Sequence, residues 1–389
     1  MVKKLTQGTD QSYARVVNNE LVIQKLRESE YSATEIAEFL NLSNATMSSI
    51  LKGLLQTGLI KISHSIAKYQ KGRKQICYTL DENYGLILVV SLSDNRYKII
   101  ISNIKEEILL SDEKQIDTYD ISTIHTIVLK IKDMLSNSEY SNIPVKQIVI
   151  AVPGRVNSVT GELQLSKHFD KNLFESSNTI IEIFKKHFDA PIYMENDMNL
   201  AIIGEMKCDY LKNASNAMLV YVDNGMGGAF ILNNDFYGGD FGYAGEIGLM
   251  SANFDNQENF IDEFVSLRSL KNYAAQKYSC KMHVNDIVNK YNSDVDFKKY
   301  VLETAHVLGT KLRDIVELLN LSDIVILGRV SLFGDDYLNC VRQEIEKSQN
   351  KCKVLFSKLG KNSILLGAIS SSVDKAITVI ETKKAAVHV

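Results

Sequence analysis

The sequence predicts an α/β protein of two similar lobes, preceded by a small, mostly helical domain at the amino terminus. Apolar residues recur at helical spacing in short segments over the first 58 residues. Beyond residue 81 the pattern changes to strands that alternate with helices. That order occurs twice, each time as three strands and then alternating helices and strands, which indicates two similar lobes. The cleft between such lobes is the expected ligand site.

The first 80 residues have the order of elements of a winged helix-turn-helix. Ser32 and Glu35 have the spacing of a capping box, in which each side chain accepts a hydrogen bond from the other residue's backbone, and this box opens a second helix. Asn41 to Ser43 form the turn before a third helix, and Gly58 closes that helix. We expect domain 1–80 to contain three helices and two strands, over residues 11–28, 36–40, 44–56, 59–62 and 75–80.

This domain is basic, whereas the rest of the chain is acidic. The net charge is -3, and residues 1–80 carry eleven Lys and Arg against six Asp and Glu, a net +5 that leaves -8 for the remainder. No acidic residue lies between Phe39 and Leu80. Such a basic module indicates a polyanion as its partner.

Double-stranded DNA is the expected partner of the third helix and of the basic segment 69–74 between the strands. The polar face of the helix suits phosphate and base-edge contacts, and an Arg at the tip of a wing suits a narrow minor groove. A helical protein-interaction module with a solvated basic loop is the competing interpretation, which the lack of acidic residues makes the weaker one. The predicted DNA contacts are Ser43, Asn44, Thr46, Ser48, Ser49, Lys52, Arg73 and Lys74.

The body is expected to form two lobes, 81–198 and 199–363, with the last helix, 364–389, joined to the first lobe. The first half should contain strands and helices near residues 84–92, 96–104, 106–110, 122–135, 147–152, 180–188, 192 and 198–210. The second half should contain them near residues 218–223, 227–232, 236–237, 300–319, 323–327, 336–347, 353–356 and 364–379.

Asn196 and Asp197 stand at the end of a short apolar strand that follows Pro191. A carboxylate at that place can accept hydrogen bonds from the vicinal hydroxyls of a sugar, or act as a general base on one of them. The alternative is that the pair only caps the helix that follows, since both residue types favour that position. These residues alone leave both interpretations open.

The winged domain resembles that of sugar-responsive repressors of the ROK family (repressors, open reading frames and kinases), through residues 42–50, 55–60 and 72–74. The body resembles the same family through five motifs in family order, at residues 151–157, 161–163, 195–199, 225–228 and 242–248. The resemblance implies a duplicated ribonuclease-H-like, actin-like sugar-kinase fold behind a winged helix-turn-helix.

By this resemblance, several residues match positions that hold a sugar in the family. Asn196, Asp197 and Glu246 match residues that hydrogen-bond sugar hydroxyls, and Asp197 stands at the position of the kinase base. Asp262 replaces a family Glu, and His168 falls near a family Asn. A carboxylate-rich pocket suits polyols, because ionised oxygens accept strong hydrogen bonds. The expected effector site consists of Gly154, His168, Asn196, Asp197, Glu246 and Asp262.

The chain departs from the family where its kinases bind ATP. Ser91 stands at the usual Asp of the first phosphate-binding turn, and residues 91–96 contain no glycine. Arg329 replaces one glycine of a pair that faces the adenosine. Gly225 and Gly227 remain in the second turn, where they could equally be ordinary turn glycines. We therefore expect no catalytic residue and no ATP.

The family's structural zinc site is also missing from this sequence. Leu249 replaces a zinc-binding His, and no Cys or His follows over residues 250–256, so packing must hold that loop instead. The odd number and scatter of the cysteines argue against a disulfide framework or zinc cluster at Cys77, Cys208, Cys280, Cys340 and Cys352. We expect no metal.

A cytoplasmic protein without a membrane partner is expected. No apolar run approaches the ~20 residues needed to cross a bilayer, and the amino terminus lacks the apolar segment of a secretion signal.

Together these features predict a sugar-responsive, DNA-binding transcriptional regulator that represses a carbohydrate-utilisation operon. Its kinase-like body is expected to bind a small carbohydrate or sugar derivative without catalysis. We expect a homodimer or higher homo-oligomer, because paired winged helices match palindromic half-sites. Two alternatives stay open: an ATP-dependent sugar kinase with Asp197 as its base, and a regulator that has lost its effector and responds to a protein partner.

Overall fold

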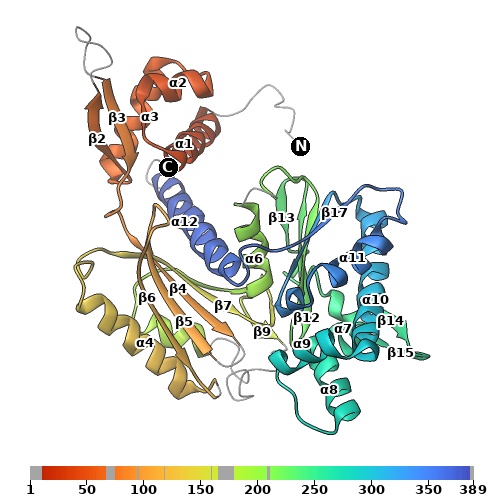
Figure 1. The fold of residues 1–389 in the computed structure, drawn as a ribbon. Coiled ribbons are helices and arrows are strands. Elements are labelled where there is room, and N and C mark those ends of the chain that lie inside the picture. The colour runs from red at the N-terminus through yellow and green to blue at the C-terminus, as the bar shows by residue number, and fades with distance from the viewer. Residues whose placement is uncertain are drawn as a thin grey trace.

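The computed structural model describes residues 11–66, 75–93, 96–117, 119–158, 160–164, 179–207 and 211–385 (Figure 1). It contains a winged helix-turn-helix and two α/β lobes, each built on a five-stranded sheet. The predicted duplicated α/β architecture is therefore confirmed.

The amino-terminal domain packs three helices against a three-stranded sheet. Its capping box forms as predicted: Ser32 Oγ accepts a hydrogen bond from the Glu35 backbone N–H at 3.3 Å, and Glu35 Oε2 accepts one from the Ser32 N–H at 3.0 Å. The short strand β1 was not predicted, because two residues carry no periodic pattern. The elements are α1 (Gln11–Glu28), β1 (Tyr31–Ser32), α2 (Ala33–Leu40), α3 (Asn44–Thr57), β2 (Ile60–Ile66) and β3 (Gln75–Leu80).

The first lobe has the strand order β10-β7-β4-β5-β6. β4, β5 and β6 are antiparallel neighbours, whereas β7 and β10 run parallel to β4. Its strands are β4 (Leu86–Ser93), β5 (Arg96–Asn103), β6 (Ile108–Gln115), β7 (Val145–Val152) and β10 (Ile192–Asn196). Its outer helices are α4 (Ile121–Ser136) and α5 (Thr179–Lys185).

The second lobe repeats this arrangement with the strand order β13-β12-β11-β16-β17. Two antiparallel pairings are again followed by parallel strands. Its strands are β11 (Ala217–Val222), β12 (Met226–Leu232), β13 (Asp235–Tyr237), β16 (Asp323–Leu327) and β17 (Lys353–Phe356). Its long outer helices are α10 (Val295–Leu319) and α11 (Gly334–Ile345).

A segment between the two halves of the second lobe contains elements that the sequence did not reveal. These are β14 (Ser251–Phe254), β15 (Gln257–Phe260), α7 (Asp262–Val265), α8 (Leu267–Tyr278) and α9 (Val284–Ser293). The predicted loop at 250–256 is largely a β-hairpin, whose turn residues Asp255 and Asn256 have φ values of 50° and 57°. The Phe254 ring packs edge-on against Phe264 and Tyr300. Backbone pairing and aromatic packing thus hold this segment.

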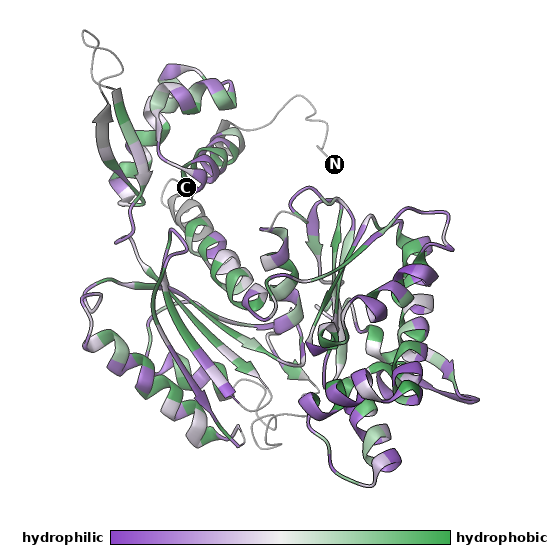
Figure 2. Cartoon of the chain, viewed as in Figure 1, coloured by the Kyte–Doolittle hydropathy of each residue, from purple (hydrophilic) through white to green (hydrophobic). Residues whose placement is uncertain are grey.

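Two helices, α6 (Asp197–Met206) and α12 (Asn362–Ala385), lie between the lobes. Glycines bring their backbones into contact: a Cβ on Gly204 would lie 2.0 Å from the Ser363 carbonyl oxygen, and one on Gly367 would lie 1.8 Å from that of Leu200. One continuous cluster of buried hydrophobic residues runs from α1 and α3 through both helices to the two sheets. Figure 2 shows hydrophobic residues along α12 and along the strands of both sheets.

Together, the helices α6 and α12 pack against both lobes, and α6 crosses the domain boundary that was predicted between residues 198 and 199. The predicted boundary after residue 80 coincides with the end of β3, whereas the one predicted between residues 198 and 199 falls inside α6. α12 contacts β4 and β7 of the first lobe, and α6 contacts β11 and β12 of the second. The inner helices therefore bind the two lobes to each other.

Gly367→Ala should destabilise the protein by about 3 kcal/mol or more, because an added Cβ has no room beside the α6 backbone. Gly53→Ala is the matched control, since no heavy atom lies within 4 Å of its new Cβ. It should be neutral or stabilising by up to about 1 kcal/mol. Urea unfolding measures both changes, and a Gly367→Ala midpoint equal to that of wild type would contradict the close contact.

Candidate functional site

A cavity of about 960 Å³ lies between the two lobes, within the size range of small-molecule sites. Its first-lobe wall comes from the ends of β4 and β10, the turn after β7 and the first turn of α6. Because β4, β7 and β10 are parallel, their carboxyl ends meet at one edge of the sheet, where ligands bind in open α/β sheets. The second-lobe wall comes from β12, residues 242–249, α7, α8 and the start of α12.

Asn196 caps α6 and fixes the cavity wall. Its Oδ1 accepts hydrogen bonds from the backbone N–H groups of Met198 and Asn199 at 2.8 and 3.1 Å, and its Nδ2 donates to the Gly154 carbonyl at 2.7 Å. The capping interpretation therefore holds for Asn196. Asp197 is the first residue of α6 and lines the cavity, where the positive end of the helix dipole favours a carboxylate.

The carboxylates of the second-lobe wall are paired with arginines. Glu246 Oε1 lies 3.3 Å from Arg155 Nε, and Asp262 Oδ2 accepts a hydrogen bond from Arg268 Nη2 at 2.5 Å. Asp262 Oδ1 is buried and has no hydrogen-bond partner among the described residues. A buried acceptor of this kind in a cavity wall suits a ligand hydroxyl.

Gly245 sets the position of Glu246. It has φ of 101°, a region that glycine enters at little cost, and a Cβ there would lie 2.1 Å from the Gly228 carbonyl oxygen. The segment that carries Glu246 can therefore lie directly against β12.

Asp223, at the end of β11, is almost fully buried and is paired with Arg329. Arg329 Nε lies 2.9 Å from both carboxylate oxygens, its Nη2 donates to Oδ1, and its backbone N–H lies 3.3 Å from Oδ2. Burial raises the pKa of Asp223, but the hydrogen bonds and charge of Arg329, together with the charge of Lys361, outweigh burial and hold this pKa below its ordinary value.

Gly328 makes this pairing possible. Its φ is 121°, and a Cβ there would lie 2.1 Å from the Val222 carbonyl oxygen. The chain after β16 can therefore run close to β11, which brings the Arg329 guanidinium to Asp223.

Further cations line the cavity. Lys271 Nζ donates to Asn224 Oδ1 at 2.7 Å, and Lys361 lies at the start of α12. On the first-lobe side, Arg96 pairs with Glu113 at 2.7 Å. The wall thus combines carboxylates, guanidinium groups and ammonium groups, which supply both hydrogen-bond acceptors and donors to the cavity.

The turn after β4 is held by a buried tyrosine. Ser91 lines the cavity, and the Ser93 backbone N–H donates to the Tyr119 hydroxyl at 2.9 Å. The same hydroxyl donates to the Ser93 carbonyl at 2.8 Å. The backbone of Ser93 is therefore engaged within the protein.

The exposed face of α3 carries the predicted DNA contacts. Asn44, Ser48, Ser49 and Lys52 are exposed, whereas Met47, Ile50, Leu51 and Leu54 are buried. Ser43 is the N-cap of α3, and its Oγ accepts a hydrogen bond from the Thr46 N–H at 3.1 Å. In the free protein, the Ser43 hydroxyl therefore caps α3 through the Thr46 backbone. Arg73 and Lys74 lie outside the described residues.

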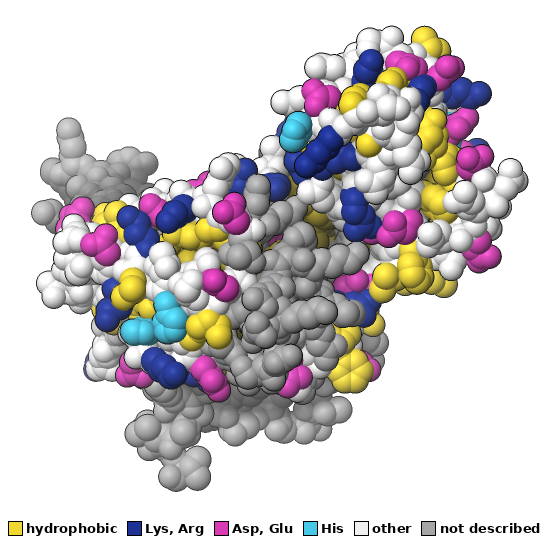
Figure 3. All heavy atoms as spheres, turned by 90° about the horizontal axis from the view of Figure 1, so that it is seen from below, with side chains coloured by type: hydrophobic (Ala, Val, Ile, Leu, Met, Phe, Trp, Pro, Cys, Tyr) yellow, Lys and Arg dark blue, Asp and Glu magenta, His cyan; other side chains and the backbone are white. Residues whose placement is uncertain are grey.

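The side of the body that faces away from the winged-helix domain carries charges of both signs. Seen from below in Figure 3, the described residues present acidic and basic side chains interspersed with smaller hydrophobic areas. This face of the body therefore carries charges of both signs, whereas the segment between Phe39 and Leu80 of the winged-helix domain contains no acidic residue.

The structure brings five predicted effector residues to one cavity: Gly154, Asn196, Asp197, Glu246 and Asp262. His168 lies outside the described residues. The prediction missed Arg155, Arg268 and Lys271. Arg155 directly follows the predicted Gly154, and Arg268 lies only six residues after Asp262, whereas tertiary folding brings Lys271 to Asn224 across 47 residues of sequence.

Within the described ranges, no three His, Cys, Asp or Glu side chains are grouped to hold a metal ion. No helix of that part of the chain is both long and apolar enough to cross a membrane.

A winged helix-turn-helix in front of two copies of one α/β lobe, with a polar cavity between them, defines a class of two-lobed, actin-like proteins with an added winged-helix domain. The chain belongs to the ROK family, whose model matches residues 92–373. It is similar to the xylose repressor of Caldicellulosiruptor bescii, with 23% identity over 91% of this chain and 94% of the relative. The xylose repressor of Bacillus subtilis is 22% identical over 95% of this chain and 98% of its own length.

Solved structures show the same fold. A ROK family transcriptional regulator, described as a homologue of the E. coli MLC protein, matches 95% of this chain and 99% of its own with a TM-score of 0.79 and 16% identity. The ROK glucokinase of Streptomyces griseus matches 75% of this chain and its own whole length with a TM-score of 0.60 and 19% identity. The regulator thus covers the winged-helix domain as well as the body.

Arg329→Gln should lower the free energy of unfolding by about 1–3 kcal/mol at neutral pH, because the buried Asp223 loses its charged partner. Asp223 has a lowered pKa, so its pairing stabilises the fold above the ordinary Asp pKa and loses this effect as the pH falls through the lowered value. The deficit of the variant should therefore shrink in acid. Urea unfolding from pH 7 to pH 3 measures this, and a deficit independent of pH would contradict it.

Proposed function

We propose that this protein is a sugar-responsive DNA-binding transcriptional regulator that acts as a repressor. The observation that carries this proposal is the combination in one chain of a winged helix without acidic residues between Phe39 and Leu80 and a two-lobed body whose cavity displays carboxylates. The relatives named xylose repressors and the regulator that spans almost the whole chain support it.

The effector is a small carbohydrate or a sugar derivative. Asp197, Glu246 and Asp262 supply ionised acceptors to one cavity, and such oxygens form strong hydrogen bonds with hydroxyl groups. Asn196 contributes by holding Gly154 and the first turn of α6, since much of its side chain already bonds the protein. The similarity to xylose repressors makes D-xylose the first sugar to test.

The body binds without phosphoryl transfer. Phosphoryl transfer depends on groups that position and neutralise the phosphates. Here Arg329 already pairs with Asp223, and the Ser93 N–H already donates to Tyr119. These contacts do not fit a nucleotide, and with β14–β15 in place of a zinc-binding loop they support a protein that needs neither ATP nor zinc.

Ligand binding controls DNA binding through the angle between the lobes. A sugar held by both walls favours the closed cleft only by the difference between its affinities for the closed and open states. In a homodimer, a change of closure alters the separation of the two winged helices and so their match to paired half-sites. This mechanism operates in the cytoplasm, where the operator DNA lies.

A kinase is the second candidate function, because Asp197 lies in the cavity and the fold is shared with ROK kinases. ATP consumption in the presence of a sugar panel tests it. Turnover that Asp197→Asn abolishes would overturn the regulator proposal in favour of the enzyme.

Lys52→Gln should weaken DNA binding about equally for specific and random sequences and reduce the slope of log K against log salt by about 0.9, because one phosphate contact is lost. Lys281→Gln, which removes an exposed lysine of the body, is the control and should have no effect. Fluorescence anisotropy with DNA from the protein's own operon and with random DNA measures both. If wild type shows no salt-dependent preference for its own operon, the proposed function is wrong.

Asp197→Asn should remove most of the thermal stabilisation given by a bound sugar, because a charged acceptor contributes about 1.5–3 kcal/mol to such hydrogen bonds. D-xylose, other mono- and disaccharides and their phosphates are screened by thermal shift, where a ligand at 100 times its Kd stabilises by about 2.7 kcal/mol. Asp240→Asn, an exposed carboxylate of the second lobe, is the control and should keep the shift. No shift with any sugar would favour a regulator without a small-molecule effector.

A further inference from the structure

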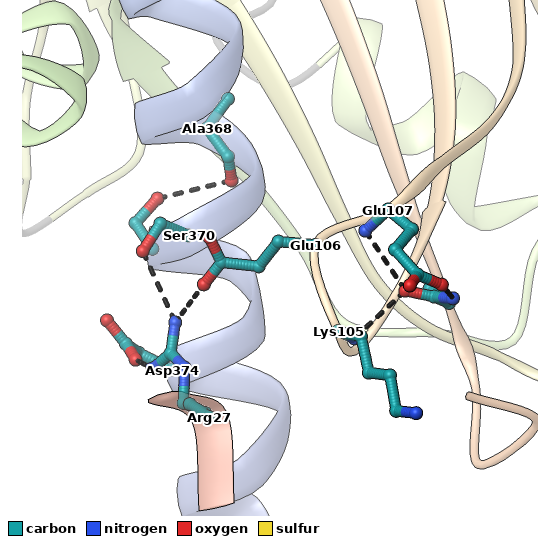
Figure 4. A network of polar contacts seen from close by, with 9 residues as sticks. Arg27, Lys105, Glu106, Glu107, Ala368, Ser370 and Asp374 are labelled. Carbon is teal, nitrogen blue, oxygen red and sulfur yellow. Dashed lines mark hydrogen bonds and ion pairs between the residues drawn. The ribbon is translucent and has the colours of Figure 1, made fainter. Parts of the chain in front are cut away.

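Arg27, near the end of α1, joins the winged-helix domain to the body (Figure 4). Its Nη1 donates to Asp374, and its Nη2 donates to Glu106 and, at 3.3 Å, to Ser370 Oγ. The Arg27 side chain is only 15% exposed. One guanidinium group therefore contacts two separate parts of the body, α12 and the turn between β5 and β6.

The turn that presents Glu106 has a fixed shape. Glu106 has φ of 67°, a left-handed conformation that is uncommon for residues other than glycine. Asn103 holds this turn: its Oδ1 accepts hydrogen bonds from the backbone N–H groups of Lys105 and Glu107 at 2.9 and 3.1 Å. The position of the Glu106 carboxylate is thus set by the first lobe.

The same turn contacts the winged-helix domain through a second ion-pair group. Glu82, in the connection after β3, bonds Lys61 of β2 and lies 3.1 Å from Lys105. The hydrogen bond from Lys61 lowers the pKa of Glu82 to about 2, against the effect of burial. Glu82 is therefore ionised at neutral pH. The turn between β5 and β6 is thus held at Glu106 by Arg27 and at Lys105 by Glu82.

The other acceptor, Asp374, lies on the helix that begins at the cavity. Asn362, Ile364 and Leu365 of α12 line the cavity, and Asp374 follows Asn362 by twelve residues, about 18 Å along the helix axis. α12 touches the α6 backbone at Gly204 and Gly367. A movement of the α6 start, where Asp197 lies, must therefore be followed by α12.

A second connection leads from the cavity to the same turn of α12. Tyr193 of β10, which leads to Asn196 and Asp197, has its hydroxyl 2.9 Å from Ser371 Oγ and 3.0 Å from Ser372 Oγ. Lys375 Nζ lies 3.6 Å from the centre of the Tyr193 ring. The residues around Asp374 are thus coupled to the strand that carries the predicted effector residues.

We propose that Arg27 is the positioning residue that transmits movement of α12 to the DNA-binding domain, by holding Asp374 of α12 and Glu106 of the first lobe at the same time. A planar guanidinium satisfies both carboxylates only at one separation. When α12 moves relative to the turn at Glu106, Arg27 keeps one acceptor and loses the other, and α1 changes its orientation. Only the biological use of this coupling, the control of DNA binding, rests on the proposed function. The coupling itself can be measured in the protein without sugar or DNA.

The first experiment measures hydrogen exchange in the full-length protein without sugar or DNA. Arg27→Gln should speed amide exchange over residues 22–28 about tenfold and leave β4 and β7 unchanged, because α1 loses its charged anchors. Arg27→Lys, which keeps the charge but not the fork, and Asp374→Asn should have smaller effects in the same segment. Arg15→Gln is the matched control, because Arg15 is an exposed arginine of the same helix outside the measured segment and should not matter. If residues 22–28 of Arg27→Gln exchange their amide hydrogens at the wild-type rate, the proposal is overturned.

The second experiment separates transmission from a merely structural role. Leu365→Ala loosens the cavity end of α12, distant along the helix from Asp374. It should speed exchange in α1 severalfold when Arg27 is present and have no further effect in the Arg27→Gln background, although distant substitutions normally add. If Leu365→Ala speeds exchange in α1 equally with Arg27 present and in the Arg27→Gln background, movement is not transmitted through Arg27. A failed DNA-binding or sugar-binding assay would leave this result intact and would count against the proposed function alone.

Discussion

The contact between the backbones of α6 and α12 is the constraint on which the arrangement of this protein depends. Gly204 and Gly367 allow the two helices to meet without side chains between them. Each helix also packs on the sheets, α12 on the first and α6 on the second. The hydrophobic cluster that surrounds them extends into the winged-helix domain. The three parts of the chain therefore share one hydrophobic cluster, and α6 and α12 lie at its centre.

The cavity depends on the same helices, since its wall includes the first turn of each. Asn196 ties the α6 start to the turn after β7 through the Gly154 carbonyl. Arginines of both lobes neutralise the carboxylates of the second-lobe wall, Arg155 at Glu246 and Arg268 at Asp262. Arg268 bonds only one oxygen of Asp262, so the buried Oδ1 remains an acceptor in the cavity wall.

Local patterns in the sequence were sufficient for the architecture of the fold, because most of its helices and strands carry a signal of their own. The capping box at Ser32 and Glu35, the period of α3 and the hydrophobic strands of both sheets depend on residues close together in the chain. β1 and α7 are too short to carry a periodic pattern and were missed, and α8 and α9 were missed although a Ser266 cap marks the start of α8. The candidate site was predicted through motifs that contain Gly154, Asn196, Asp197 and Glu246. The partners of its carboxylates were not: Arg155 reaches Glu246 only when the two lobes come together, and Arg268, six residues after Asp262, was not recognised.

The pairing of Asp223 with Arg329 has a consequence for the conditions under which this cleft works. An aspartate buried at the end of a strand requires a counter-ion, and a protein that takes it from solution depends on the supply of that ion. Here the counter-ion is a side chain of the same polypeptide. Asp223 therefore keeps its partner whatever ions the surrounding solution contains, and the segment between Tyr221 and Asn224 next to the cavity holds its charge balance within the chain.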